Sequence, residues 1–286
     1  MAEANLDGRT CLVTGATSGI GQATAVGLAR KGARLILVAR SASRGETSVA
    51  AVKAASGNES IELALADLAS LDSVRALAVS ILERAPSLHV LVNNAGVVNL
   101  ARETTVDGLE TTFAVNHLAH FLLSRLLLER LMASAPARVV NVASEGHRFG
   151  RIDLEDLQNE RKKYSWMRVY GASKLANVLF TYELARRLEG TGVTANCLHP
   201  GAVATGLGTN NGRIGRIVIP LLRPFFLTPA QGAETSIFLA ASDQVAGVTG
   251  KYFVRCAPKP SSRVSQNREL ARELWGASNR LTGLSG

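Results

Sequence analysis

The feature that most constrains this chain is a repeated alternation of short apolar runs and longer segments with helical periodicity. Runs such as TCLVTGA (10–16), RLILVAR (34–40) and HVLVNNAG (89–96) are largely apolar, and a helix-like segment follows each of them. Strands of this kind are buried on both faces, which is typical of parallel sheets. Because parallel strands need right-handed crossovers, the alternation predicts a single-domain α/β fold over residues 1–286. We expect a doubly wound parallel sheet of about seven strands with helices on both faces.

Glycine, proline and short polar clusters set the bounds of the expected elements. The expected strands are residues 10–16, 34–40, 61–67, 89–96, 137–144, 193–201 and 251–254. The expected helices are residues 21–31, 43–55, 71–84, 109–133, a segment that contains YGASKLAN (170–177) and ends near 189, and 228–242. Residues 257–286 begin with a polar stretch rich in proline and serine, and we interpret them as a polar C-terminal extension.

A glycine-rich loop, TGATSGIG (14–21), follows the first strand and opens the first helix. Without a Cβ, Gly15, Gly19 and Gly21 permit a tight turn and let a pyrophosphate approach the main-chain N–H groups at the helix start, where the helix dipole favours negative charge. The alternative is a tight turn with no ligand. In its strand–turn–helix context the loop predicts a Rossmann-type dinucleotide-binding fold.

The end of the second strand indicates which dinucleotide is bound. Folds that bind NAD usually carry an acidic residue there, about 20 residues after the glycine loop, to hold the ribose 2′-hydroxyl. This chain has Arg40 at that point, with Arg44 close by. A guanidinium suits a 2′-phosphate, so NADP(H) is favoured over NAD(H), although a solvent-facing arginine remains the alternative. Asp67, at the end of the third strand, is expected either at the adenine edge or as a helix cap.

Tyr170 and Lys174 are four residues apart and share one face of a helix. A free phenol has a pKa of roughly 10, and a neighbouring ammonium is expected to lower it, so that the phenol can give a proton to a carbonyl or take one from an alcohol. Ser144, at the end of the fifth strand, would hydrogen-bond the same substrate oxygen. Tyr164 and Tyr182 have arginines at the same offset, and Tyr164 is the more plausible substrate contact of the two.

With these motifs in place, the sequence resembles the short-chain dehydrogenase/reductase family over about residues 8 to 256. NNAG (93–96) is similar to its strand-four motif, and Ser144 and YGASK to its catalytic serine and Tyr-x-x-x-Lys motif. The resemblance implies that Asn116 joins the catalytic set, bends its helix and binds a water in a proton relay from Lys174. It also implies cofactor contacts from Thr17, Ser18, Ile20, Leu68, Asn94, Ala95, Gly96, Tyr170, Lys174, Pro200, Gly201, Val203 and Thr205.

Within that family, VNHLAHFLL, SKLANVLF, HPGAVATGL and the long insert between Ser144 and Tyr170 resemble the retinol dehydrogenase-like branch. The resemblance implies lipophilic alcohols and carbonyl compounds as substrates, and dimers or tetramers are common in the family. Ser144, His147, Tyr164 and Tyr170 are the expected substrate contacts. Residues 203–228, glycine-punctuated and then apolar, are expected to form a lid. Residues 214–227 are equally compatible with an oligomer contact or a peripheral membrane patch.

Composition excludes several other classes of protein. The formal charge is +9, but no basic run interleaves with aromatic residues, so a solvated basic surface is expected rather than a nucleic-acid site. The first ten residues, MAEANLDGRT, contain no apolar stretch, so no signal peptide is expected, and no run approaches the roughly 18 apolar residues of a membrane span. Three cysteines without ligand spacing indicate buried thiols in a reducing compartment, and a cytoplasmic location is expected. His117, His120 and His147 lack the spacing of a metal site, so no metal is expected.

Taken together, the motifs predict an oxidoreductase that transfers a hydride between NADP(H) and a small-molecule alcohol or carbonyl compound, with Tyr170 as general acid and base. An NADP(H)-binding sensor or scaffold without catalysis is the first alternative. A lyase or epimerase, which would consume no cofactor, is the second.

Overall fold

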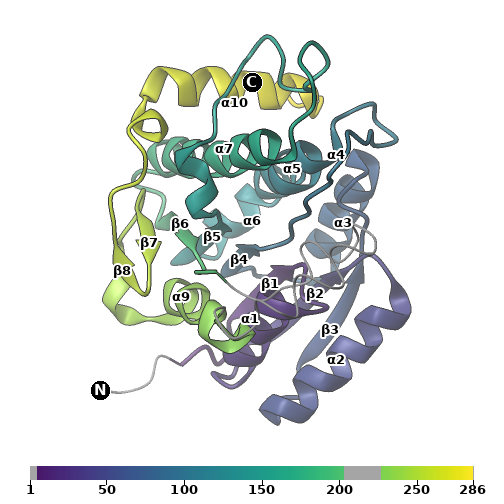
Figure 1. Ribbon diagram of the computed structural model, residues 1–286. Coiled ribbons are helices and arrows are strands. Elements are labelled where there is room, and N and C mark those ends of the chain that lie inside the picture. Colours follow the sequence, from purple (N-terminus) through teal and green to yellow (C-terminus); the bar gives the residue numbers. More distant parts are fainter. Residues whose placement is uncertain (1–4, 203–226, 286) are drawn as a thin grey trace.

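The computed structural model describes residues 5–202 and 227–285, and over these residues the strands form one sheet (Figure 1). The sheet order is β3-β2-β1-β4-β5-β6-β7-β8. The strands are β1 Thr10–Thr14, β2 Arg34–Ala39, β3 Ile61–Leu65, β4 Val90–Asn93, β5 Ala137–Val142, β6 Val193–His199, β7 Tyr252–Val254 and β8 Ala257–Pro258. Strands β1 to β7 pair in parallel, which confirms the predicted doubly wound α/β fold. The two-residue β8 pairs antiparallel with β7, so the sheet has one strand more than the seven expected.

Helices connect the strands, and several differ from the expected elements. They are α1 Gly19–Ala29, α2 Ala42–Ser56, α3 Leu71–Arg84, α4 Thr111–Phe113, α5 Ala119–Leu126, α6 Leu128–Ala133, α7 Trp166–Arg187, α9 Pro229–Ala241 and α10 Arg268–Leu281. Residues 114–118 form a π-helix, η1, and short 3₁₀ turns are η2 Glu145–Arg148, η5 Asp243–Val245 and η6 Val264–Gln266. The single helix predicted over 109–133 is therefore wrong in detail, because the π-helix and a break at Leu127 divide it.

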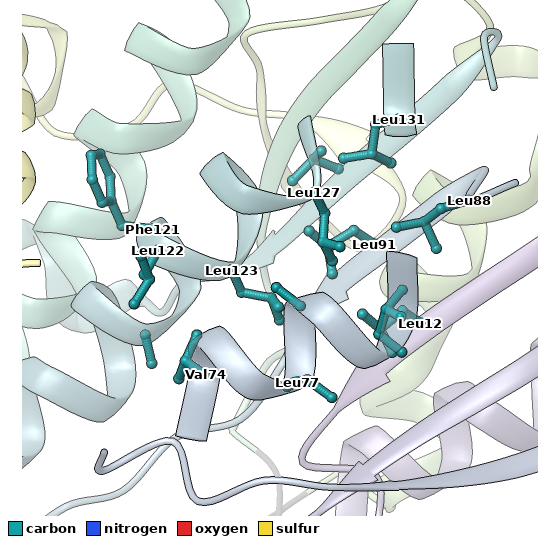
Figure 2. Close-up of a cluster of buried hydrophobic side chains, with 14 of the residues drawn as sticks. Leu12, Val74, Leu77, Leu88, Leu91, Phe121, Leu122, Leu123, Leu127 and Leu131 are labelled. Carbon is teal, nitrogen blue, oxygen red and sulfur yellow. The ribbon is translucent and has the colours of Figure 1, made fainter. Parts of the chain in front are cut away.

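Successive strand residues point to opposite faces of the sheet, and this alternation builds two hydrophobic cores. On β1, Leu12 packs into the core beneath α3, α5 and α7, whereas Cys11 and Val13 pack beneath α1, α2 and α9. Figure 2 shows part of the first core, where Leu12 and Leu91 meet side chains of α3 and α5. Burying each such leucine contributes roughly 1.5–3 kcal/mol of transfer free energy, which holds the helices against the sheet.

Helix α10 lies within residues 257–286, which the sequence analysis interprets as a polar C-terminal extension, and it packs on the outer side of α7 (Figure 1). Asn267 caps it, because its side chain accepts hydrogen bonds from the N–H groups of Glu269 and Leu270. Leu274 and Trp275 are almost fully buried, and the guanidinium of Arg187 on α7 stacks over the indole ring at 4.3 Å from its centroid. The helix thus extends the core outward, beyond the layer that covers the sheet.

Candidate active site

The glycine loop between β1 and α1 is packed too closely at Gly15 and Gly21 to admit a side chain there. Gly15 and Gly19 have left-handed backbone angles, with φ of 66° and 56°. A Cβ on Gly21 would lie 2.2 Å from the carbonyl oxygen of Gly15, and one on Gly15 would lie 2.7 Å from Cα of Ala95. Ser18 stands at the N-cap of α1 without a side-chain cap, and no acidic residue occupies the first turn. An uncapped helix start behind a glycine turn fits the pyrophosphate of a dinucleotide.

The end of β4 fastens the loop in place. The side-chain amide of Asn94 donates to the carbonyl oxygens of Thr14 (2.9 Å) and Gly15 (3.3 Å). In return, the hydroxyl oxygen of Thr14 accepts the main-chain N–H groups of Asn94 (2.9 Å) and Ala95 (3.1 Å). The side chain of Asn94 therefore holds the main chain of the glycine loop in place.

The residues expected at the adenosine end of the cofactor lie at the same carboxyl edge of the sheet. Arg40 follows β2 and is exposed, and neither it nor Arg44 makes a hydrogen bond or ion pair with another described residue. The carboxylate of Asp67 accepts the N–H of Ala69 at 3.0 Å. The N-cap of α3 is Ser70, whose side chain accepts the N–H of Ser73, so the helix-cap alternative for Asp67 is wrong. Among the other expected contacts, Ser18 is exposed, Thr17 is half-buried, and Ile20 and Leu68 are buried.

Ser144 and Tyr170 converge beside Gly146. A Cβ on that glycine would lie 3.2 Å from Cε1 of Tyr170 and 3.5 Å from Oγ of Ser144. Oγ of Ser144 accepts the N–H of Gly146 at 3.1 Å, so its own proton is free to be donated elsewhere. Burial raises the pKa of the Tyr170 phenol, and hydrogen bonding to Ser144 opposes that rise. Tyr170 is thus held as a neutral phenol, the form that can donate a proton.

Lys174 lies beneath the Tyr170 ring, almost fully buried, with Nζ 5.7 Å from the ring centroid. Nζ donates to the main-chain oxygen of Val142 at 3.1 Å. Burial lowers the pKa of Lys174 to about 8. The expected net lowering of the Tyr170 pKa is wrong, because burial of the phenol raises it, and Nζ of Lys174 bonds to the main-chain oxygen of Val142.

Asn116 lies within the π-helix η1, in which main-chain hydrogen bonds join residues i and i+5 instead of i and i+4. Its Oδ1 accepts the N–H of Val97 at 2.7 Å, and its Nδ2 donates to the oxygen of Val97 (3.0 Å) and to Oγ of Ser173 (3.1 Å). A Cβ on Gly96 would lie 3.3 Å from Oδ1 of Asn116 and 3.6 Å from Nζ of Lys174. The bare glycine therefore leaves space between the two functional side chains.

Two of the expected substrate contacts are occupied by structural bonds. His147 is fully buried; its Nδ1 lies 2.6 Å from the oxygen of Ser144, and its Nε2 accepts the N–H of Ser262 at 3.0 Å. The hydroxyl of Tyr164 donates to Asn99 (3.1 Å) and to the carboxylate of Glu110 (3.3 Å), and burial raises its pKa to about 12. In this structure the polar atoms of both side chains bond to other parts of the chain.

The strand end after β6, on the same edge, carries Pro200 and Gly201, both half-buried. Leu227 returns to the same point: its N–H donates to the oxygen of Ala202 at 2.8 Å, and its Cδ1 would lie 2.4 Å from a Cβ on Gly201. The expected cofactor contacts Val203 and Thr205 lie outside the described residues, as does all of the expected lid 203–228 except Leu227 and Thr228.

Three residues that hold this site together are not among the site residues expected from the sequence. The hydroxyl of Thr14, the carbonyl of Val142 and the ring of His120 act through bonds to segments far away in the chain. The one sequence signal that could have found His120 is its place four residues after Asn116, on the same helical face.

Two kinds of feature are absent from the parts of the chain that the structure describes. Over residues 5–202 and 227–285, no three His, Cys, Asp or Glu side chains are grouped so that they could hold a metal ion. Over those same ranges, no helix combines the length and apolarity that crossing a bilayer requires.

Comparison with known proteins gives consistent matches. Residues 9–213 match the family model described as short chain dehydrogenase. Retinol dehydrogenase 12 of Mus musculus is 44% identical over 279 residues, which cover 98% of this chain and 88% of that protein. Retinol dehydrogenase 13 of Homo sapiens is 43% identical over 288 residues, 99% of this chain and 87% of that protein.

Solved structures agree with these sequence matches. A protein from Mycobacterium paratuberculosis superposes with a TM-score of 0.81 at 34% identity, covering 99% of this chain and 97% of that one. RhlG of Pseudomonas aeruginosa in complex with NADP superposes with a TM-score of 0.70 at 29% identity, covering 87% and 95% of the two chains.

Proposed function

This chain belongs to the short-chain dehydrogenase family, in its retinol dehydrogenase-like branch, and we propose that it uses NADP(H) to interconvert a lipophilic alcohol and its carbonyl compound. Members of the family bind nicotinamide cofactors and act as oxidoreductases. The names of its relatives favour retinoid-like alcohols, aldehydes or ketones as the substrate class. The uncapped start of α1 and the glycine turn would hold the pyrophosphate.

The preference for NADP(H) rests on the free cations after β2. Arg40 and Arg44 are exposed, and neither guanidinium is occupied by another described residue. A guanidinium binds a phosphate through charge-assisted, often bidentate hydrogen bonds, and an arginine at this strand end suits a 2′-phosphate. The complex of RhlG with NADP shows that a related chain takes this cofactor.

The observation that carries the proposal is the convergence of Ser144 and Tyr170 beside Gly146, at the edge where the glycine turn also lies. A bound nicotinamide would supply or accept the hydride. In the reducing direction, the neutral phenol of Tyr170 gives its proton to the carbonyl oxygen, and the Ser144 hydroxyl donates a hydrogen bond to that same oxygen. In the oxidising direction, the phenolate takes the proton back. Lys174 supplies the cation that stabilises the phenolate once the phenol has lost its proton.

Substitution of Tyr170 tests this assignment. Tyr170→Phe keeps the ring and removes the proton, so kcat for NADPH-dependent reduction of aldehydes and ketones, retinal among them, is expected to fall by about 10²–10⁴-fold. The dissociation constant for NADPH should change little. Tyr182→Phe on the same helix is the matched control, because its hydroxyl bonds to Ser261 at 2.8 Å and not to Ser144. An active Tyr170→Phe enzyme would rule out the proton-transfer role.

The same assay separates the alternatives. A sensor or scaffold binds NADPH but shows no wild-type turnover with any alcohol or carbonyl compound. A lyase or epimerase converts its substrate without net change in the cofactor absorbance.

A further inference from the structure

His120 occupies a buried position between the two parts of the site. It lies on α5 directly after the π-helix and is 1% exposed. Its Nδ1 is 3.1 Å from the main-chain oxygen of Asn116, and its Nε2 is 3.3 Å from the hydroxyl of Thr14. Asn116 belongs to the catalytic side of the site, and Thr14 to the cofactor loop.

Hydrogen-bond accounting fixes the protonation state of this ring. A carbonyl oxygen only accepts, so Nδ1 must carry a proton to bond with Asn116. The hydroxyl oxygen of Thr14 already accepts the N–H groups of Asn94 and Ala95, so Thr14 bonds to the ring by donating its own proton to Nε2. His120 is therefore a neutral imidazole with its proton on Nδ1. Burial and the nearby Lys174 lower its pKa to about 3, in agreement with a ring that stays neutral.

The two partners of His120 differ in what they can do without it. The hydroxyl of Thr14 has a second acceptor, the oxygen of Val92 at 3.3 Å, and would keep both N–H groups of the cofactor side. The Asn116 carbonyl would lose the imidazole donor inside a π-helix, whose wider turn is less favourable than a regular α-helical one. With the main chain at Asn116 less firmly held, the Asn116 side chain would no longer stay where it bonds to Val97 and Ser173.

We propose that His120 is a positioning residue that ties the main-chain carbonyl of Asn116 to Thr14 and so holds Asn116 in register with Lys174. The proposal rests on the oxidoreductase function proposed above. It assigns His120 an effect on turnover rather than on cofactor affinity, because Thr14 can keep its other bonds without the ring.

The neighbouring His117 is a matched control. It is also fully buried on the same stretch of chain, three residues earlier, and both of its ring nitrogens are paired. Its partners are Asn177 at 3.3 Å and Ser278 of α10 at 2.9 Å, and neither of these side chains bonds to Asn116 or Thr14. Substitution of either histidine leaves buried polar groups unpaired and lowers stability, so only effects beyond that loss report on the site.

The first experiment compares His120→Leu, His120→Gln and His117→Leu. With kcat measured per folded enzyme, His120→Leu is expected to lose at least tenfold in kcat, with the NADPH dissociation constant within threefold of wild type. Glutamine retains an N–H donor that reaches the Asn116 carbonyl, so His120→Gln should recover most of kcat. His117→Leu should lower the melting temperature by a similar amount and keep kcat within threefold. Equal kcat losses in the two leucine variants would overturn the proposal.

The second experiment needs no turnover, so it separates this proposal from the function on which it rests. Nitrogen-15 spectra of the wild-type protein should show the His120 ring neutral, with the proton on Nδ1. Amide hydrogen exchange at Val97, whose N–H bonds to Asn116, should speed up at least tenfold in His120→Leu and not in His117→Leu. A proton on Nε2, or unchanged exchange at Val97, would refute the positioning role. If both results are as expected and no substrate turns over, the positioning role stands and the oxidoreductase function fails.

Discussion

The carboxyl edge of the sheet has two halves that are built in different ways. The half from β1 to β3, which we propose binds the dinucleotide and call the dinucleotide half, is shaped by a main-chain glycine turn and an uncapped helix start, with exposed arginine side chains at its rim. The catalytic half, from β4 to β6 with η1 and α7, is shaped by buried polar side chains that bond to one another and to the backbone. These buried side chains are Asn93, Asn116, His120, Asn141, Lys174, Asn177 and Thr181.

The difference indicates how each half responds to substitution. A main-chain turn has no spare volume at its glycines, so even one methyl group is excluded, whereas its exposed cations can change without effect on the fold. Buried polar side chains depend on their partners, because an unpaired buried group costs about 1–3 kcal/mol. We therefore expect loss of binding from one half, and loss of turnover or stability from the other.

The largest effect is expected from Gly21→Ala in the dinucleotide half. The new Cβ would lie 2.2 Å from the carbonyl oxygen of Gly15 and 2.4 Å from Nδ2 of Asn94, so the glycine turn must open. NADPH affinity should fall by more than about 100-fold, a loss of about 2.7 kcal/mol or more, in a calorimetric titration. Gly276→Ala on α10 is the control, since its nearest neighbour is Nη1 of Arg280 at 3.7 Å. Normal NADPH binding by Gly21→Ala would break the comparison.

The second effect is expected from acid, and it should arise from His117 and His120, which are buried in the region of the catalytic half. Burial lowers the pKa of His117 to about 4 and of His120 to about 3 in the folded protein. Unfolded histidines titrate near 6.5, so below that pH the unfolded chain binds more protons and the free energy of unfolding falls as pH falls. Each ring contributes a slope of up to about 1.4 kcal/mol per pH unit until its folded pKa is reached.

Urea unfolding at a series of pH values from 7 down to 4 measures this slope. His117→Gln and His120→Gln should each flatten it. His89 is the control, because it lies at the opposite edge of the sheet, where the N–H of Thr10 donates to its Nδ1 at 3.0 Å. A larger flattening from His89→Gln would place the acid sensitivity outside the catalytic half.

The smallest effect is expected from Arg40→Asp, at the rim of the dinucleotide half. Hydrogen bonds to charged groups contribute about 1.5–3 kcal/mol, so NADPH affinity should fall by about 10–100-fold while NADH affinity rises. The melting temperature should stay unchanged, because Arg40 is exposed and bonds to no other described residue. Arg272→Asp, exposed on α10, should alter neither cofactor affinity. An unchanged ratio of NADPH to NADH affinity would show that Arg40 does not bind the 2′-phosphate.

The two halves also differ in how far the sequence predicts them. The glycine turn and Arg40 follow from residue type and spacing, because the main chain adjacent in sequence forms the dinucleotide half. Ser144, Tyr170 and Lys174 could be chosen from motif order, and the structure brings them to one edge. The direction of the Tyr170 pKa could not be predicted, because it depends on burial by segments distant in the chain.

The same limit applies to the helices. The apolar run over 109–133 predicts one helix, and nothing in its periodicity marks the π-helix, which is accompanied by bonds from Asn116 to Val97 and Ser173. Helix α10 is different, because Leu270, Leu274 and Leu281 do have helical spacing. The polar proline- and serine-rich stretch before it obscured that signal.

The position of α10 has a consequence for the order of biosynthesis. The apolar flank of α7 is complete once Arg187 has been translated, but the side chains that cover it, among them Leu274 and Trp275, are made almost a hundred residues later. A ribosome adding about 5–20 residues per second leaves that flank uncovered for roughly 5–20 seconds. During that interval the nascent chain exposes an apolar surface, and chaperones are expected to bind to α7.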